Sequence, residues 1–282
     1  MRTVHPRVVL GLHRSRHERS LLTEAADLGV DGIDTSSNYL GFQSHRVLAE
    51  TAGDLLSRFA VSTKIGYFPA GSASEHSLNP DRLSSAVEDA ARDLGREPNL
   101  VFLHNPEHSI AHLSKSSASK RLGAACSVLV DATVRGLCGA WGISTWDPRP
   151  LSGLTSIEIP RPDVLMVRSG LLVGAEILHA ADVVAARLRP TVVWGMSPFG
   201  GNGSDLIWQR FDPRVFMHTP ERCTPMQAAF RTAFHLPTVN AVAMGTNKAS
   251  HLHELTKSME YPVDLEAVST YRDLLRRGHQ RD

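Results

Sequence analysis

GVDGIDTSSNY at residues 29–39, RFAVSTK at 58–64 and NLVFLHN at 99–105 are three short apolar runs that end in polar side chains. Helix-like sequence separates them, so each run is typical of a buried strand in a parallel α/β sheet. In closed barrels of this kind, catalytic groups collect where the strands end. The sequence therefore predicts four polar residues at one rim: Asp34, Tyr39, Lys64 and His104.

Composition places the chain among ordinary globular proteins. It has 282 residues, 42% hydrophobic and 21% charged, with a net charge of +1. This balance argues against disorder and gives no global field that would favour nucleic acid or a membrane surface. Three widely spaced cysteines fit reduced thiols, and no Cys/His spacing predicts a metal site. With no signal peptide and no apolar stretch of ~18 residues, we expect a cytoplasmic protein.

Strand-like runs recur along the chain. The first lies at residues 8–12, and the three runs quoted above supply the next ones. Later strands are expected at 138–145 (CGAWGIST), 163–169 (DVLMVRS), 191–197 (TVVWGMS) and 239–245 (VNAVAMG), with a short last strand near 261–263.

Amphipathic helices are expected between the strands, over 16–28, 44–56, 81–95, 122–135, 175–186, 225–234, 249–258 and 265–277. A loop rich in glycine, serine and proline is expected over 68–80, and 108–120 reads as a loop or a poorly formed helix start. Regular alternation without a break in composition predicts one domain over residues 1–282. The eight helices that alternate with these strands, with no GxGxxG after the first strand, favour a single-domain (α/β)8 TIM barrel over an open Rossmann sheet.

Each of the four rim residues has an ordinary interpretation when it is taken alone. Asp34 could be a helix N-cap, Tyr39 an amphipathic loop residue, and His104 a satisfied core histidine. Lys64 is harder to explain, because an ammonium at the mouth of an apolar barrel needs a carboxylate partner.

Together, the four side chains supply what carbonyl reduction needs besides a hydride. A phenol with a pKa of about 10 is a poor acid at neutral pH unless its anion is stabilised. An adjacent lysine lowers that pKa, and a carboxylate keeps the lysine charged. An imidazole N–H beside the phenol can orient the carbonyl oxygen.

The chain contains five motifs: GIDTSSNYLGFQSHRVLAE, STKIG, VFLHNPE, GIST and SPFGG. They occur in the order and spacing of the aldo-keto reductases. The chain resembles this family from about residue 9 to about residue 255. The resemblance implies an (α/β)8 barrel that binds NADPH, or less often NADH, across the C-terminal rim. It implies that Tyr39 is the general acid and that Lys64 tunes its pKa. Asp34 would then be the partner of Lys64, and His104 would orient the carbonyl.

The resemblance also implies a set of cofactor-binding residues. The residues expected at the nicotinamide are Ser144, Thr145, Met166 and Met196. Those expected at the pyrophosphate are Ser197, Phe199, Gly200 and Gly201. Those expected at the adenosine phosphate are Gly245, Thr246, Asn247, Lys248 and His251. Four of these depart from the family's pattern: Thr145 replaces an asparagine, Met166 a glutamine, Met196 an aromatic residue and His251 an arginine. An ordinary capped surface helix is the alternative for 245–255.

Three segments are expected to bound the substrate pocket, namely 67–80, 105–120 and 202–219, with Trp146 and Trp208 as candidate walls. Ordinary packing is the alternative for both tryptophans. The chain ends soon after its last predicted helix, so we expect no long C-terminal segment over the pocket.

These observations predict an NADPH-dependent oxidoreductase that reduces an aldehyde or ketone of a small metabolite, with NADH possible and with no nucleic-acid or membrane partner. Two alternatives stay open. A Schiff-base lyase could use Lys64 as its nucleophile, and borohydride trapping with a carbonyl substrate would separate the two chemistries. A catalytically weak barrel could bind a nicotinamide nucleotide without useful turnover.

Overall fold

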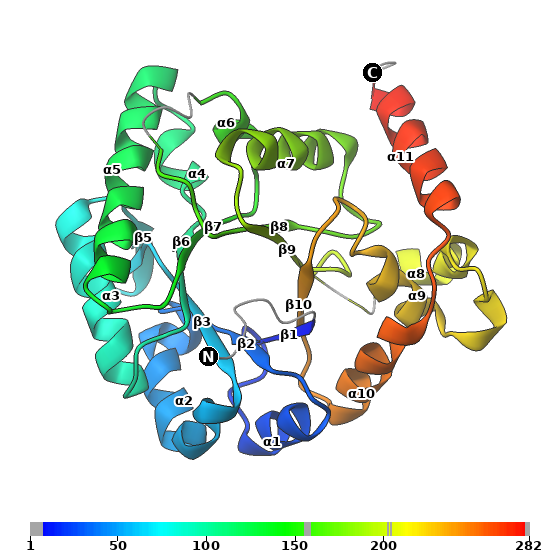
Figure 1. Cartoon of the computed structure of the whole chain (residues 1–282), viewed down its shortest axis with the longest axis horizontal. Helices are drawn as coiled ribbons and strands as arrows, with labels where there is room; N and C mark the ends of the chain where they lie inside the picture. The colour runs from blue at the N-terminus through cyan, green and yellow to red at the C-terminus, as the bar shows by residue number, and fades with distance from the viewer. Residues whose placement is uncertain (1–7, 155–158, 202, 204, 280–282) are drawn as a thin grey trace.

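The computed structural model of the chain describes residues 8–154, 159–201, 203 and 205–279. Within these ranges, eight parallel strands close into a barrel in the order β1, β10, β9, β8, β7, β6, β3, β2 (Figure 1). The strands are β1 (Val8–Gly11), β2 (Gly32–Asp34), β3 (Ala60–Ile65), β6 (Leu100–His104), β7 (Trp141–Thr145), β8 (Val164–Arg168), β9 (Val192–Met196) and β10 (Ala241–Gly245). The predicted (α/β)8 TIM barrel is confirmed.

Helices surround the ring of strands (Figure 1). The α-helices are α1 (Arg19–Asp27), α2 (Ser44–Ala52), α3 (Pro80–Leu94), α4 (Glu107–Ile110), α5 (Lys115–Val134), α6 (Arg149–Ser152), α7 (Ala175–Leu188), α8 (Ile207–Arg210), α9 (Pro225–Thr232), α10 (Ala249–Lys257) and α11 (Leu265–His279). Single 3₁₀ turns are η1 (Tyr39–Phe42), η2 (Gly53–Arg58), η4 (Pro213–Phe216), η5 (Pro220–Arg222) and η6 (Ser258–Glu260).

Local sequence signals set the ends of α3, which confirms the helix predicted over 81–95. The Asn79 side chain accepts a hydrogen bond from the Arg82 amide at 3.1 Å, and Pro80 occupies the first turn. Gly95 ends the helix in the left-handed conformation at φ 67°, which glycine adopts without a steric penalty. The helix is therefore bounded by its own sequence as well as by packing.

The barrel interior is filled by apolar side chains from several strands. Phe102 and Trp194 meet edge to face there, with ring centroids 5.7 Å apart. Gly142 makes room for Phe102, because a Cβ at this glycine would lie 2.8 Å from the Phe102 ring and 2.4 Å from the Val164 carbonyl oxygen. A second apolar layer packs between the strands and the surrounding helices. These two layers hold the strand ends, and hence the rim, in a fixed arrangement.

The parallel register brings the polar residues of the quoted runs to one rim. Asp34 pairs with Ser62 on β3, and Lys64 pairs with Phe102 on β6. His104 pairs with Ser144 on β7. Because all strands run in the same direction, the residues that end them open on the same face of the barrel.

Two sequence predictions of local structure are wrong, and a third holds only in part. Residues 261–263 add no strand to the barrel, which is complete at β10; Val263 forms only an isolated antiparallel bridge with Met217. Residues 68–80 are not only a loop, since β4 (Tyr67–Ala70) and β5 (Ala73–His76) form an antiparallel hairpin. Residues 108–120, predicted as a loop or a poorly formed helix start, hold most of α4 and the start of α5, which the Ser114 side chain caps.

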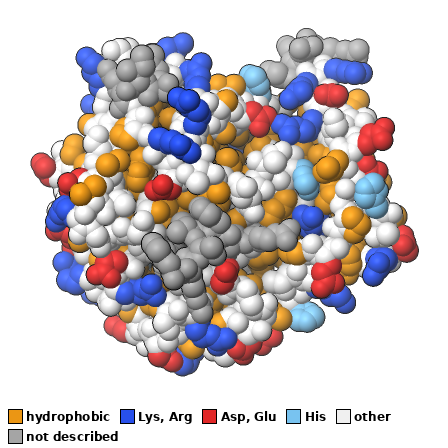
Figure 2. Space-filling model, viewed as in Figure 1, with side chains coloured by type: hydrophobic (Ala, Val, Ile, Leu, Met, Phe, Trp, Pro, Cys, Tyr) orange, Lys and Arg blue, Asp and Glu red, His pale blue; other side chains and the backbone are white. Residues whose placement is uncertain are grey.

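Charged side chains of both signs are interspersed around the face shown in Figure 2. This pattern agrees with the near balance of 30 basic and 29 acidic residues. In the described part of the chain, no helix is both long and apolar enough to cross a membrane.

Two buried histidines support the β2–β3 side of the barrel. His17 Nε2 lies 2.7 Å from Ser44 Oγ, and His45 Nε2 lies 2.6 Å from Thr63 Oγ1. Burial lowers the pKa of each histidine from 6.5 to about 4, and His17 adds to the effect at His45. Both imidazoles are therefore neutral in the folded chain at neutral pH.

This burial predicts a pH-dependent stability. Between pH 6.5 and 4, the unfolded chain takes up protons that the folded chain does not, so the free energy of unfolding falls as the pH falls. Each histidine contributes about 1.4 kcal/mol per pH unit in that window. In chemical denaturation, wild type should lose roughly 2–3 kcal/mol more than His45→Gln between pH 7 and 4.5. The exposed control His112→Gln should follow wild type. A pH-independent difference between wild type and His45→Gln would contradict the prediction.

Candidate active site

A cavity of about 420 Å³ opens over the carboxyl ends of the strands. Gly11, Met196 and Gly245, which end β1, β9 and β10, lie in its wall. The four rim residues predicted from the sequence also line it: Asp34, Tyr39, Lys64 and His104. The structure therefore brings together the side chains that end separate runs of the sequence.

Asp34 and Lys64 form a hydrogen-bonded ion pair in the floor of the cavity, with 5% and 2% of each residue exposed. Ser62 Oγ donates to Asp34 Oδ1 at 2.8 Å, and Lys64 Nζ donates to the Thr35 carbonyl at 2.9 Å. Burial disfavours the ammonium, but the charge of Asp34 and then Tyr39 outweigh it, so the pKa of Lys64 lies above its usual value. The ammonium is thus a fixed positive charge beneath the cavity.

Tyr39 lies above this charge in a backbone turn of unusual conformation. Lys64 Nζ lies 5.3 Å from the centroid of the Tyr39 ring, and the His13 ring meets it edge-on at 4.7 Å. The next three residues, 40–42, are all left-handed, with φ of 50°, 61° and 68°. Leu40 and Phe42 have side chains, so this backbone is strained and fixes the phenol's direction.

The pKa of the Tyr39 phenol reflects two opposing effects. Burial raises it and Lys64 lowers it, and the balance lies above the usual value. The expected influence of the lysine is present, but it offsets burial only in part. The phenol is therefore protonated at neutral pH, and the ammonium below it is placed to stabilise the phenolate once the proton has left.

His104 presents one ring nitrogen to the protein and the other to the cavity. Its Nδ1 lies 3.1 Å from Ser36 Oγ, and no described residue forms a hydrogen bond with Nε2. Burial, followed by the charge of Lys64, holds the pKa of His104 well below its usual value. The imidazole is therefore neutral and carries a single N–H.

Two of the segments predicted to bound the pocket contribute a cavity residue each, Tyr67 and Asn105. The Tyr67 hydroxyl lies 2.8 Å from His108 Nδ1 and accepts a hydrogen bond from Asn105 Nδ2 at 3.3 Å. His76 Nε2 lies 2.7 Å from the carbonyl oxygen of His104, which ties the hairpin to β6. Sequence reasoning missed His13, Arg14 and Asn38, which also line the cavity.

A buried carboxylate positions the Trp146 wall. Glu107 accepts hydrogen bonds from Thr145 Oγ1 at 2.9 Å and from the amides of Trp146 and Asp147 at 2.8 and 2.9 Å. Burial raises the pKa of Glu107, and these donors oppose the shift. Trp146 lines the cavity as predicted.

The second candidate wall, Trp208, does not line the cavity. Its ring packs edge-on against Phe199, with centroids 6.2 Å apart. In the third predicted boundary, 202–219, Gly203 contributes to the wall, whereas residues 202 and 204 lie outside the described residues.

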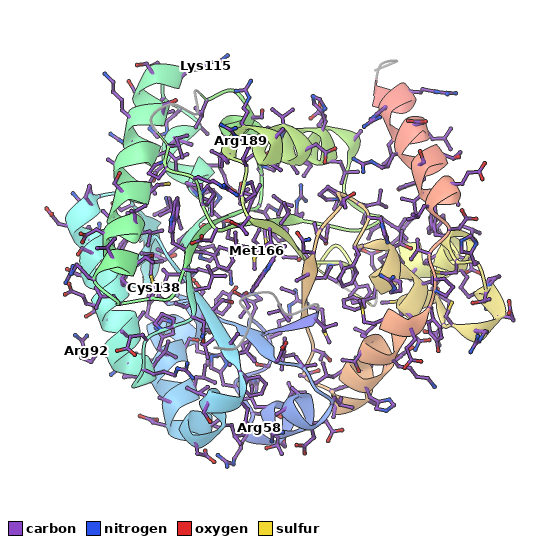
Figure 3. The ribbon with its side chains drawn as sticks, in the orientation of Figure 1. Arg58, Arg92, Lys115, Cys138, Met166 and Arg189 are labelled. Carbon is purple, nitrogen blue, oxygen red and sulfur yellow. The ribbon has the colours of Figure 1, made fainter. Side chains whose placement is uncertain are left out.

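The residues predicted at the nicotinamide separate into two groups. Met196 lines the cavity. Ser144, Thr145 and Met166 are fully buried and do not line it. Ser144 Oγ donates to Met166 Sδ at 3.5 Å, and Met166 lies within the ring of strands (Figure 3). The side-chain polar groups of this trio therefore face other protein atoms.

The residues predicted at the pyrophosphate form a loop directly after β9. Ser197, Phe199 and Gly201 line the cavity, whereas Gly200 lies outside its wall. Ser197, Gly200 and Gly201 have left-handed backbones, with φ of 55°, 66° and 90°. A loop of this kind can present backbone amides to an anion.

The residues predicted at the adenosine phosphate surround the start of α10. Gly245 lines the cavity, and Thr246 Oγ1 accepts a hydrogen bond from the Lys248 amide at 3.1 Å. Asn247, Lys248 and His251 are exposed, and no side chain caps the helix. The first amides of α10 thus remain open to an anion. Across residues 8–154, 159–201, 203 and 205–279, no group of three His, Cys, Asp or Glu side chains is arranged to hold a metal ion.

Solved structures share this fold at low sequence identity. An aldo-keto reductase from Bacillus halodurans in its holo form has a TM-score of 0.73 and 15% identity, covering 96% of this chain and 92% of that chain. The glycerol dehydrogenase of Gluconobacter oxydans has a TM-score of 0.71 and 17% identity, covering 98% and 93%. An aldo/keto reductase from Brucella melitensis has a TM-score of 0.68 and 14% identity, covering 95% of each chain.

These likenesses show the fold alone. A search of curated proteins finds no match to this sequence. The model of the aldo/keto reductase family matches residues 14–179, which include all four rim residues. Since this match spans more than half of the 282 residues, the chain belongs to the aldo/keto reductase family.

Proposed function

We propose that the protein is an NADPH-dependent reductase of aldehydes or ketones of small metabolites, with Tyr39 as the proton donor. One observation carries this proposal: a buried ion pair, Asp34 with Lys64, lies beneath a protonated phenol and a neutral imidazole in one cavity. This set has the groups needed to protonate a carbonyl oxygen as hydride reaches its carbon. Family membership supports the same chemistry.

The four residues have separate roles in the proposed reaction. A bound carbonyl compound presents its oxygen between Tyr39 and His104. As the carbonyl carbon accepts a hydride, the C–O π electrons move to oxygen, and Tyr39 transfers its O–H proton to that oxygen. Lys64 stabilises the resulting phenolate by its charge, and Asp34 keeps Lys64 charged and oriented. His104 fixes the position of the oxygen through Nε2.

The residues of the cavity fit a nicotinamide dinucleotide, which would supply the hydride when bound. Gly11 and Gly245 pair with each other on β1 and β10 and line the cavity. Because they have no side chains, they leave space in the cavity floor on this side. The left-handed loop after β9 offers backbone amides for a diphosphate, and the open start of α10 suits a further phosphate. The nicotinamide end has fewer side-chain donors, because Ser144, Thr145 and Met166 are buried.

The two alternative functions differ in how the structure bears on them. A Schiff-base lyase needs an uncharged lysine as its nucleophile, whereas Asp34 raises the pKa of Lys64. This shift counts against the lyase. A barrel that binds the nucleotide without useful turnover differs from a reductase only in rate, so the mutational test below separates them.

Replacing Tyr39 by phenylalanine should abolish most carbonyl reduction while leaving NADPH affinity nearly unchanged. The substitution removes only the proton donor, and general acid catalysis typically contributes about 10²–10⁴-fold. The measurement is single-turnover reduction over an aldehyde and ketone panel, with NADPH binding followed by nicotinamide fluorescence. Turnover within a few-fold of wild type on a substrate limited by chemistry would remove Tyr39 from the acid role. Cofactor binding by wild type without turnover on any substrate would favour the non-catalytic barrel.

Lys248→Ala tests the choice of cofactor. If the exposed Lys248 side chain contacts a 2′-phosphate at the start of α10, its loss should weaken NADPH binding by about one to two decades and NADH binding much less. The selective loss should shrink as salt rises, because exposed pairs are screened. Lys257→Ala, at the other end of the same helix, is the matched control and should weaken neither cofactor. Equal weakening of both cofactors by Lys248→Ala would contradict the assignment.

A further inference from the structure

Two further side chains, Ser36 and Asn38, continue the hydrogen bonding of His104. Ser36 is fully buried, and its Oγ lies 3.1 Å from His104 Nδ1. The same hydroxyl donates to Asn38 Oδ1 at 2.6 Å. A third acceptor, the Lys64 carbonyl, lies 3.3 Å from Ser36 Oγ. Asn38, Ser36 and His104 thus form a chain that begins at the cavity wall and returns to it.

The direction of this chain determines which nitrogen of His104 carries the proton. A hydroxyl has one proton, and a neutral imidazole has one N–H. When Ser36 donates to Asn38, the contact with His104 is a hydrogen bond only if Nδ1 is the donor. His104 Nε2 then has no proton and faces the cavity as an acceptor. In this direction, His104 cannot donate a hydrogen bond to a carbonyl oxygen.

The opposite direction requires rotation of the Asn38 amide and of the Ser36 hydroxyl, together with transfer of the imidazole proton from Nδ1 to Nε2 through solvent. If the Asn38 amide turns over, its NH₂ group donates to Ser36 Oγ, and the hydroxyl donates to His104 Nδ1. The imidazole proton is then on Nε2, where it can meet a carbonyl oxygen. No covalent bond of the main chain changes between the two states, and no net proton is gained or lost.

We propose that Ser36 and Asn38 are positioning residues that select the tautomer of His104 and so convert its cavity-facing nitrogen between acceptor and donor. This inference rests on the proposed reductase function, because only a carbonyl substrate requires the donor state. Ser36 acts through His104 and does not contact the reacting atoms. Asn38 is the point at which a bound molecule can influence the chain, because it lines the cavity.

Two substitutions at position 38 separate this role from a structural one. Asn38→Asp keeps the shape and adds only acceptors, so it holds the Ser36 proton and keeps His104 as Nδ1–H. Asn38→Ala removes the acceptor at 2.6 Å, and of the two acceptors that remain for the Ser36 proton, His104 Nδ1 at 3.1 Å is nearer than the Lys64 carbonyl at 3.3 Å. We expect kcat/KM for carbonyl reduction to be at least about 10-fold lower for the aspartate than for the alanine variant. A structural role predicts the reverse order, since alanine removes more contacts.

The added charge of Asn38→Asp is controlled by repeating both substitutions in a Ser36→Ala background. Without the Ser36 hydroxyl, no hydrogen-bonded chain connects residue 38 to the imidazole of His104. The difference in kcat/KM between the aspartate and alanine variants should then shrink to the effect of the charge alone. A difference of the same size in both backgrounds would overturn the proposal.

A readout independent of activity is the ¹⁵N spectrum of the ¹⁵N-histidine-labelled full-length protein, with His104→Asn used to assign the signals. The pyrrole-type shift should belong to Nδ1 in Asn38→Asp and to Nε2 in Asn38→Ala. The same tautomer in both variants would refute the selection of the tautomer by this chain. If wild type reduces no carbonyl compound but the two variants differ in tautomer, the proposed function fails and the hydrogen-bonded chain stands.

Discussion

The ion pair between Lys64 and Asp34 is the interaction on which the candidate site depends. An ammonium and a carboxylate buried at a barrel mouth are stable only when each is paired and its remaining hydrogen-bonding groups are satisfied. Ser62 and the Thr35 carbonyl provide those further contacts. Removing one partner of such a pair typically costs about 3–5 kcal/mol, so the pair constrains β2 and β3 as well as the chemistry above them. Burial has the largest effect on the pKa of Tyr39 and of His104, and the charge of Lys64 comes next at both.

The sequence predicted the barrel and the four rim residues because both follow from local patterns. Short apolar runs that end in Asp34, Lys64 and His104 mark parallel strands, and the parallel register then places their ends together. Ser36 and Asn38 were not predicted as functional, although they lie in the most informative run. Their role depends on a 3.1 Å contact with a histidine 68 residues away, which no local pattern reveals. The β4–β5 hairpin was missed because glycine, serine and proline mark turns and loops alike.

The residues proposed to bind the cofactor follow less directly from the sequence than the residues proposed for acid–base chemistry. Acid–base chemistry needs particular side chains, whereas a diphosphate is held largely by backbone amides and helix ends. The family match covers residues 14–179 and stops before the loop after β9 and the start of α10. Because Ser144, Thr145 and Met166 are buried, the cofactor contacts that we expect shift towards Met196 and the loop that follows it.

In the proposed reaction, hydride passes from a nicotinamide to a carbonyl carbon in the cavity above Lys64. The most direct measurement uses NADPH carrying two deuterium atoms at C4 of the nicotinamide ring, with an aldehyde substrate and mass-spectrometric analysis of the alcohol. We predict one deuterium atom per product molecule, bound to the former carbonyl carbon. Alcohol without deuterium would contradict this hydride transfer. So would an adduct on Lys64 that borohydride traps, formed instead of alcohol.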